Sequence, residues 1–282
     1  MKIAHLILCH AYPEQLRRLI MRLTHEDAFF YIHVDKKTEI TPFLPLGKLP
    51  NVYFIANRVK VIWAGYSQVQ AMLNSFKEML AANTQYDYIN ILSGQDYPLK
   101  STRQIHRFFA DNPGKAFMET LVISDEWQEA IPRLTKYHFT DSVFPGKYVA
   151  EWLLNAVLPM RKLPGDLIPV GRSSWLTIAP AAAKYIVDFL QENPALVRFF
   201  KFTWGVDELI FQTILYNSSF KKDIVYDNLR YVDWSEGNAN PKVLTMPDAE
   251  ALKNSGKLFA RKFSMEKDNK ILDYLDSMAS AK

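Results

Sequence analysis

Short, nearly continuous apolar runs alternate over the first 120 residues with longer segments whose apolar residues recur at helical spacing. Apolar continuity of this kind is typical of strands buried on both faces, as in a parallel sheet covered by helices. The alternation predicts a βαβ series, and therefore an α/β fold with a Rossmann-like, mostly parallel central sheet flanked by helices. The expected strands are residues 2–9, 29–35, 51–56 and 86–92, and the expected helices are 13–23, 67–82 and 101–112.

The pattern is weaker between about residues 130 and 170, where 144–159 is the only clear helix. Regularity then returns, and neither an internal repeat nor a low-complexity tract interrupts the chain, so we expect one domain over residues 1–282. The later elements are expected as a strand at 173–178, helices at 180–193 and 203–215, a strand at 229–234 and a terminal helix from about Met265.

Composition narrows the class of protein. The single cysteine, Cys9, excludes an internal disulfide and fits a reducing compartment. No apolar stretch reaches the roughly 18 residues of a membrane-spanning helix, and the N-terminal run is too short for a signal peptide. We therefore expect a cytoplasmic protein, with peripheral association at the inner face of a membrane as an option. The net charge of +4 suits anionic small ligands or a membrane surface, but not nucleic acid, because the basic residues are scattered among 30 acids.

Polar or small residues end three apolar segments. Asp35 follows the second expected strand, Gly65 and Ser67 lie in "VIWAGYS", and Asp96 follows the fourth expected strand. Ligands of parallel sheets bind at the carboxyl ends of the strands, so these positions indicate a binding site. A lone strand-end Asp is more often a turn residue, but three polar strand ends together favour a site. The sequence contains neither GxGxxG nor GxxxxGK[ST], which removes the main support for a dinucleotide oxidoreductase or a P-loop NTPase.

Six blocks in order carry a family resemblance: "FFYIHVDKK", "VIWAGYSQVQ", "YINILSGQDYPLKS", "SSWLTI", "TWGVDELIFQTIL" and "LFARKF". From its first strand to about Phe263, the chain resembles the core-2/I-branching β-1,6-N-acetylglucosaminyltransferases and the related peptide O-xylosyltransferases. The resemblance implies a GT-A-type glycosyltransferase fold, an inverting mechanism, a UDP-sugar donor and a glycan acceptor, with no metal or other cofactor. Eukaryotic members carry an N-terminal transmembrane anchor, whereas this sequence starts directly at its first expected strand. We therefore expect a free-standing, bacterial-type catalytic domain.

The fifth block contains the expected catalytic group. An inverting transferase needs a carboxylate that takes the proton from the attacking hydroxyl, and the resemblance assigns this role to Glu208. A helix start at this point would favour the ionised form of the base. Acids in a first turn also accept hydrogen bonds from backbone amides, and we expect that capping role for Asp207. About residues 1–120 would form a nucleotide-binding half, and 121–282 an acceptor and catalytic half.

The remaining blocks imply binding roles. Because the sequence lacks D-x-D, protein cations must offset the charge of the leaving diphosphate, and the resemblance assigns this to Arg261 and Lys262, with Lys242 as a further cation. Trp234 and Asp96 are expected at the acceptor, although Trp234 could equally belong to the core and a structural role is the alternative for Asp96. The other residues expected at the donor are Cys9 within the strand end Leu8–His10, Asp35, Val61, Ile62, Trp63, Gly65, Ser174 and Trp175.

Several alternatives stay open at this point. N-acetylglucosamine is the expected donor sugar, and xylose is the alternative. A metal-dependent retaining transferase would need a metal and a different catalytic geometry. A non-catalytic module that binds a sugar or nucleotide would keep the aromatic residues without needing Glu208. The acceptor, the linkage and the oligomeric state are not specified by any of these patterns.

Overall fold

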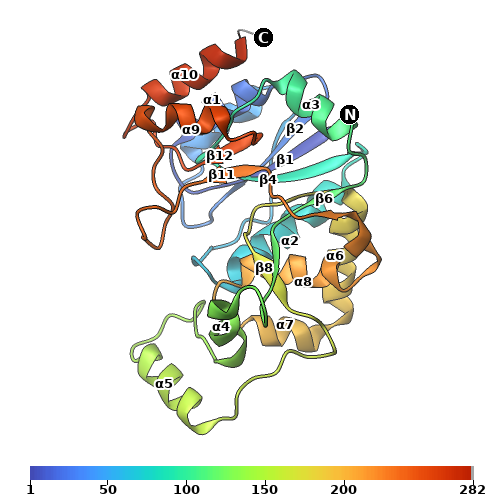
Figure 1. The fold of residues 1–282 in the computed structure, drawn as a ribbon, viewed down its shortest axis with the longest axis vertical. Coiled ribbons are helices and arrows are strands. Elements are labelled where there is room, and N and C mark those ends of the chain that lie inside the picture. Colours follow the sequence, from blue (N-terminus) through green and yellow to red (C-terminus); the bar gives the residue numbers. More distant parts are fainter. Residues whose placement is uncertain (281–282) are drawn as a thin grey trace.

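A seven-stranded sheet with strand order β10-β6-β9-β4-β1-β2-β3 lies between two layers of helices (Figure 1). The computed structural model describes residues 1–280, and the sheet takes strands from both sides of residue 120. Strand β1 pairs in parallel with β2 and β4, whereas β9 is antiparallel to β4 and β6. The predicted α/β class with a mostly parallel sheet is confirmed. The strands are β1 (Ile3–Cys9), β2 (Ala28–Val34), β3 (Val52–Phe54), β4 (Tyr88–Ser93), β6 (Ala116–Phe117), β9 (Thr177–Ile178) and β10 (Ile224–Val225).

Each face of the central sheet is covered by its own hydrophobic cluster. Ala4 and Leu6 of β1 pack with α2, α6 and α8, whereas Ile3 and Ile7 pack with α1, α3, α9 and α10. Alternate residues of a strand point to opposite faces, so burial on both sides explains the continuous apolar runs. The helices are α1 (Pro13–Leu23), α2 (Tyr66–Ala81), α3 (Thr102–Ala110), α6 (Pro180–Glu192), α8 (Ile210–Tyr216), α9 (Ala249–Asn254) and α10 (Lys270–Ser280).

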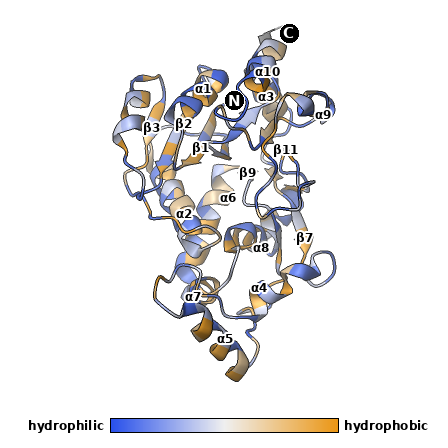
Figure 2. Ribbon diagram, turned by 90° about the vertical axis from the view of Figure 1, so that its left-hand side faces the viewer, coloured by the Kyte–Doolittle hydropathy of each residue, from blue (hydrophilic) through white to orange (hydrophobic). Residues whose placement is uncertain are grey.

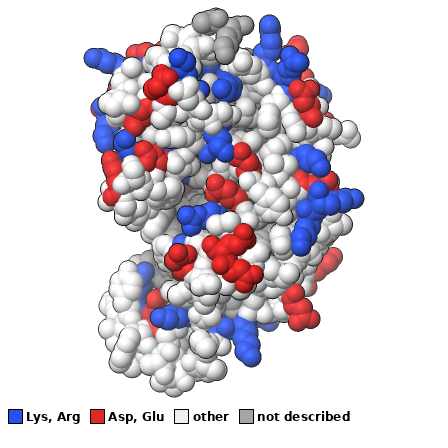
Figure 3. All heavy atoms as spheres, viewed as in Figure 1, with Lys and Arg blue, Asp and Glu red and all other residues white. Residues whose placement is uncertain are grey.

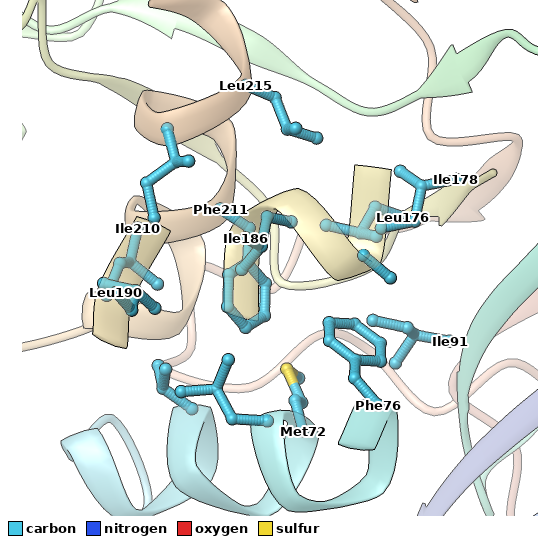
Figure 4. Packing of buried hydrophobic residues seen from close by; sticks show 14 of the residues in the cluster. Met72, Phe76, Ile91, Leu176, Ile178, Ile186, Leu190, Ile210, Phe211 and Leu215 are labelled. Atoms are coloured by element: carbon cyan, nitrogen blue, oxygen red, sulfur yellow. The ribbon is translucent and has the colours of Figure 1, made fainter. Parts of the chain in front are cut away.

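The hydrophobic cluster formed with α2 and α6 fixes α8 in place. Phe76 of α2 and Phe211 of α8 are fully buried, with ring centroids 5.7 Å apart, and Ile91 of β4 lies close to Phe76 (Figure 4). Truncating a buried Phe to Ala in such a core costs roughly 3–5 kcal/mol. Because α8 follows Glu208 almost directly, this packing also determines where the expected catalytic residue lies.

Two small sheets adjoin the central one. The first contains β5 (Asp96–Pro98), β12 (Phe259–Arg261) and β11 (Arg230–Val232), and its antiparallel register places Arg261 opposite Asp96. The second pairs β7 (Thr120–Val122) with β8 (Val170–Arg172). Because β7 and β8 flank the stretch where the sequence pattern is weak, that stretch leaves the body and returns to it at one place.

The part of this stretch that carries α5 (Lys147–Val157) projects from the body to one end of the long axis of the molecule (Figure 1), whereas Ile123, Trp127 and Leu134 before it are buried in the core. The helix predicted within 144–159 is confirmed. Buried Arg161 ties this projection to the end of α7 (Pro194–Phe200), since its guanidinium donates hydrogen bonds to the carbonyls of Lys136 and Phe202. None of the helices within residues 1–280 has both the length and the apolarity needed to cross a bilayer.

Three predicted element boundaries need correction. The helix expected at 203–215 is a 3-10 turn, η3 (Val206–Glu208), followed by α8, because Leu209 has a non-helical φ of −125°. The strand expected at 173–178 is reduced to β9, and the terminal helix begins at Lys270 rather than near Met265. The other elements are η1 (Thr41–Lys48), η2 (Gln128–Ala130), α4 (Ile131–Thr135), η4 (Ser219–Asp223) and η5 (Met246–Asp248).

Candidate active site

A cleft of 750 Å³ opens at the carboxyl ends of β1, β2 and β4. His10 follows β1, Asp35 follows β2 and Ser93 ends β4, and all three line the cleft, as expected for the ligand site of a parallel sheet. Six Lys and Arg side chains line it against four Asp and Glu side chains, so an anionic ligand is favoured. The face drawn in Figure 3 is hollowed at mid-height, with side chains of both charges around the hollow.

Asp35 joins two segments at one end of the cleft. Its buried Oδ1 accepts the backbone N–H of Lys37 at 2.9 Å and that of Val61 at 3.4 Å. Trp63 lies on the same segment as Val61 and lines the cleft with an exposed side chain. Cys9 also lines the cleft, and burial raises the pKa of its thiol to about 12, so the thiol is neutral. The structure thus brings these four predicted donor residues together.

Two residues of the same predicted block lie outside the cleft. Ile62 lines a second pocket with Tyr66. Gly65 is buried where a Cβ atom would collide with the carboxylate of Asp141, whose Oδ1 also accepts the hydroxyl of Ser67 at 2.6 Å. The glycine therefore allows close approach of this carboxylate rather than of a ligand, and the donor contacts expected of Ile62 and Gly65 need correction.

Asp207 is buried in the wall of the cleft. Its Oδ2 accepts hydrogen bonds from Nε2 of Gln68 at 2.8 Å and from the hydroxyl of Ser174, and within residues 1–280 its Oδ1 has no hydrogen-bond partner. Gly205 occupies the capping position of η3, and no side chain caps that turn, so the capping role expected of Asp207 is wrong. Burial, and then the charge of Glu208, raise the pKa of Asp207 to about 6.

Glu208 is partly exposed and faces the cleft. Its Oε2 lies 2.6 Å from Nη1 of Arg133, whose guanidinium carbon lies 4.6 Å from the ring centre of Trp127 and 4.5 Å from that of Trp204. Gly205 makes room for this guanidinium, because a Cβ atom there would lie 2.7 Å from Nη1. Two aromatic rings and one glycine thus position Arg133, and Arg133 orients the carboxylate of Glu208.

The basic side of the cleft is built on a buried ion pair. Nε of Arg261 lies 3.4 Å from Oδ1 of Asp96, and its guanidinium carbon lies 4.1 Å from the ring centre of Trp175. Arg261, Lys262, Ser174 and Trp175, all expected at the donor, line the cleft. Asp96 is fully buried behind Arg261, so the acceptor contact expected of it needs correction. Burial and the nearby charge of Arg261 lower the pKa of Lys262.

The loop after β11 brings an aromatic ring to the cleft but not the predicted cation. Trp234 is exposed and lines the cleft beside Pro241. Nζ of Lys242 lies 2.6 Å from Asp248 and 3.6 Å from Asp233, and Lys242 is not among the residues that line the cleft. Two carboxylates already offset its charge, so the diphosphate contact expected of Lys242 needs correction.

Several residues that line the cleft were not predicted from the sequence. Arg230 is buried, donates a hydrogen bond to the carbonyl of Ile91 at 2.7 Å, and has its pKa lowered to about 10 by burial. The signal for Arg230 in the sequence is its place in "LRYVDW", the expected strand that ends in Trp234. Arg133 and Arg172 come from segments that match no usable pattern. Further residues of the cleft that were not predicted include Gln68, Gln95, Glu119, Trp127 and Asn228.

Residues 1–280 contain no group of three or more His, Cys, Asp or Glu side chains placed to hold a metal ion. His33 lines the cleft, but its Nε2 accepts the N–H of Val59 at 3.0 Å, and burial lowers the pKa of the ring. The chemistry that the cleft residues offer by themselves is proton acceptance by a carboxylate and stabilisation of negative charge by guanidinium and ammonium groups.

The cleft lies at the carboxyl edge of an α/β sheet, with an excess of basic side chains and a carboxylate in its wall, and these groups suit the transfer of a group from an anionic donor. The sequence profile of the family described as Core-2/I-Branching enzyme matches residues 3–254, and the chain belongs to this family of glycosyltransferases. The predicted resemblance is confirmed, and the GT-A-type fold is the one expected of the family.

Curated relatives include xylosyltransferase 2 of Rattus norvegicus, which is 26% identical over 299 residues, covering 98% of this chain and 33% of that protein. Xylosyltransferase oxt of Drosophila melanogaster is 26% identical over 226 residues, covering 78% of this chain and 25% of that protein. The chain thus spans about a third or less of the length of these relatives. Among solved structures, apo mouse xyloside xylosyltransferase 1 aligns with a TM-score of 0.40 at 11% identity, covering 92% of this chain and 97% of that one.

We expect Asp207→Asn to be more stable than the wild type at neutral pH. The pKa of Asp207 is about 6 in the folded protein against an ordinary value of 3.8, so the unfolded chain ionises first as the pH rises. Wild-type stability therefore falls between about pH 4 and pH 6, by up to roughly 3 kcal/mol for a shift of about two pKa units. Asn carries no charge, so the advantage of the variant should be full at pH 7 and absent near pH 3.5.

Urea unfolding of both proteins across this pH range measures the difference. Glu129→Gln, at an exposed acid, is the matched control and should follow the wild type. If the free-energy difference between Asp207→Asn and the wild type did not change with pH, Asp207 would not be the buried, raised-pKa group described here.

Proposed function

We propose that this protein transfers a sugar from a UDP-sugar to a hydroxyl of a glycan acceptor, with inversion at the anomeric carbon and without a metal ion. The observation that carries the proposal is that Glu208 lines the same cleft as Arg261 and Lys262. Direct displacement needs a base beside the attacking hydroxyl and positive charge beside the leaving group. This cleft supplies both kinds of group.

Glu208 is the proposed general base. As the acceptor oxygen attacks the anomeric carbon, the carboxylate takes the hydroxyl proton, and the bond from that carbon to the UDP oxygen breaks. The partly exposed side chain and its fixed contact with Arg133 support this role. Asp207 is the weaker candidate, because its carboxylate is buried and already accepts hydrogen bonds from Gln68 and Ser174.

Arg261 and Lys262 are the proposed partners of the diphosphate. The guanidinium of Arg261 is held from behind by Asp96 and from one face by Trp175. A cation that is fixed before the reaction needs little reorganisation as charge develops on the leaving group. The missing D-x-D motif supports this role for protein cations, and the buried Asp35 beside Val61 supports the uridine end of the site.

The donor sugar has two candidates. N-acetylglucosamine follows from the branching transferases that the chain resembles, and xylose is favoured by the xylosyltransferases among its curated relatives. Release of UDP from UDP-N-acetylglucosamine and from UDP-xylose, measured without acceptor, distinguishes the two. If the protein binds UDP but releases it from neither donor, a non-catalytic binding module would be favoured.

We expect Glu208→Gln to lower the transfer rate by roughly 100- to 10,000-fold, because the amide keeps the size of the side chain but cannot accept the proton. Affinity for UDP should stay within about threefold of wild type, since the base does not contact the diphosphate. The rate is measured with saturating donor, and UDP affinity by calorimetry. Glu129→Gln again serves as the matched control, and near-wild-type transfer by Glu208→Gln would remove Glu208 as the base.

We expect UDP to bind equally well in EDTA and in manganese, because the proposed partners of the diphosphate are Arg261 and Lys262. Calorimetric titration of UDP into the protein in the two buffers measures this directly. Binding that disappears in EDTA and returns with manganese would contradict the metal-independent mechanism and leave the family assignment intact.

We expect Lys262→Met to weaken UDP binding by about 10- to 100-fold, as for loss of a charge-assisted hydrogen bond, while uridine binding changes by less than about twofold. Only UDP carries the diphosphate. Arg261 is the poorer site for this test, since truncating it leaves the buried Asp96 unpaired and threatens the fold. Lys48→Met, at an exposed lysine, is the control, and equal losses for UDP and uridine would assign Lys262 to folding.

A further inference from the structure

Helix α5 turns its polar side toward the protein. Lys147, Glu151 and Asn155 recur at four-residue spacing along one stripe, and each bonds to residues 137–142. Oδ1 of Asn155 accepts the N–H of Tyr137 at 2.7 Å, and Oε2 of Glu151 accepts the N–H of Phe139 at 2.9 Å. An amphipathic helix in a globular protein normally buries its apolar stripe, so α5 is oriented the opposite way.

The apolar stripe of α5 faces outward. We call its exposed side chains the apolar tip: Tyr148, Val149, Trp152, Leu153, Val157 and, just beyond the helix, Met160. Tyr148 is 75% exposed, Trp152 68% and Val157 79%, and α5 has no buried residue. Figure 2 shows α5 mostly orange at the end of the molecule far from both termini, and Figure 3 shows that end largely without charge. A contiguous apolar patch of this kind marks an interaction surface.

The charges around the apolar tip complement an anionic surface. No exposed residue between 143 and 160 is acidic. Exposed lysines flank it in the sequence, with Lys136 before it and Lys162 after it, and Lys60 and Lys201 line the second pocket together with Val143, which precedes α5. We call these four the lysine border. Asp141, the carboxylate in that pocket, is turned to the hydroxyl of Ser67.

We propose that the apolar tip inserts into the headgroup region of a lipid bilayer and that the lysine border binds anionic lipid headgroups. Trp and Tyr beside aliphatic side chains, with lysines at the margin, are typical of interfacial membrane helices. The tip also lies at the protruding end of the long axis, where a bilayer can reach it without meeting the rest of the protein (Figure 1). This contact does not depend on the chemistry proposed for the cleft.

The test is sedimentation of the full chain with vesicles of phosphatidylcholine mixed with phosphatidylglycerol, and with phosphatidylcholine alone. Wild type should bind the anionic vesicles. The double variant Trp152→Ser/Leu153→Ser should bind them about tenfold or more weakly, because two apolar side chains no longer leave water. Met21→Ser/Leu44→Ser removes two similarly exposed apolar side chains elsewhere and should bind as wild type.

A second variant tests the charges. Lys136→Glu/Lys162→Glu should lose binding to the anionic vesicles, and added salt should weaken wild-type binding in the same direction. Thermal midpoints of all variants, whose altered side chains are exposed, check that they fold. Wild-type protein that stays out of both vesicle pellets, or a Trp152→Ser/Leu153→Ser variant that binds like wild type, would overturn the proposal. So would a wild-type dimer that this variant dissociates, because the tip would then cover a second copy of the chain.

Discussion

The buried ion pair between Asp96 and Arg261 is the constraint on which the site depends. Asp96 follows β4 of the central sheet, and Arg261 lies on β12 near the other end of the chain. Burial raises the pKa of Asp96 and lowers that of Arg261, and each charge opposes the shift of the other. Removing one partner of such a pair costs roughly 3–5 kcal/mol. The pair lies within the antiparallel pairing of β12 with β5, and this pairing places Arg261 and Lys262 at the cleft.

One turn gives two neighbouring carboxylates opposite surroundings. Successive side chains of a 3-10 helix point about 120° apart around its axis. The turn begins after Gly205, whose φ is 64°, and its orientation places Asp207 in the wall and Glu208 in the cleft. The neutral side chains of Gln68 and Ser174 donate hydrogen bonds to Asp207, whereas the guanidinium of Arg133 bonds to Glu208. The difference between the two acids thus comes from backbone geometry, not from the type of residue.

The central sheet could be predicted because burial on both faces makes its long strands apolar at nearly every position, the exceptions including the buried His5, His33 and Asn90. The location of the cleft could be predicted as well, because ligand sites of parallel sheets lie at the carboxyl ends of the strands, and Asp35 lines the cleft. Arg133 could not, because the groups that hold it are far from it in the chain and none recurs at a readable spacing. Lys242 and Gly65 were misassigned for a related reason. Each meets a carboxylate from another segment, which a motif does not reveal.

Helix α5 shows that periodicity locates a helix without deciding which side faces the body. The backbone of residues 137–142 needs hydrogen-bond partners, and the polar stripe of α5 supplies them. Arg161, bonded to the carbonyls of Lys136 and Phe202, fixes the chain just after the helix. Turning the apolar stripe inward would break these contacts, so backbone polarity sets the orientation. The same segment carries Arg133 near its start, and so one stretch of chain connects the orientation of Glu208 to the apolar tip.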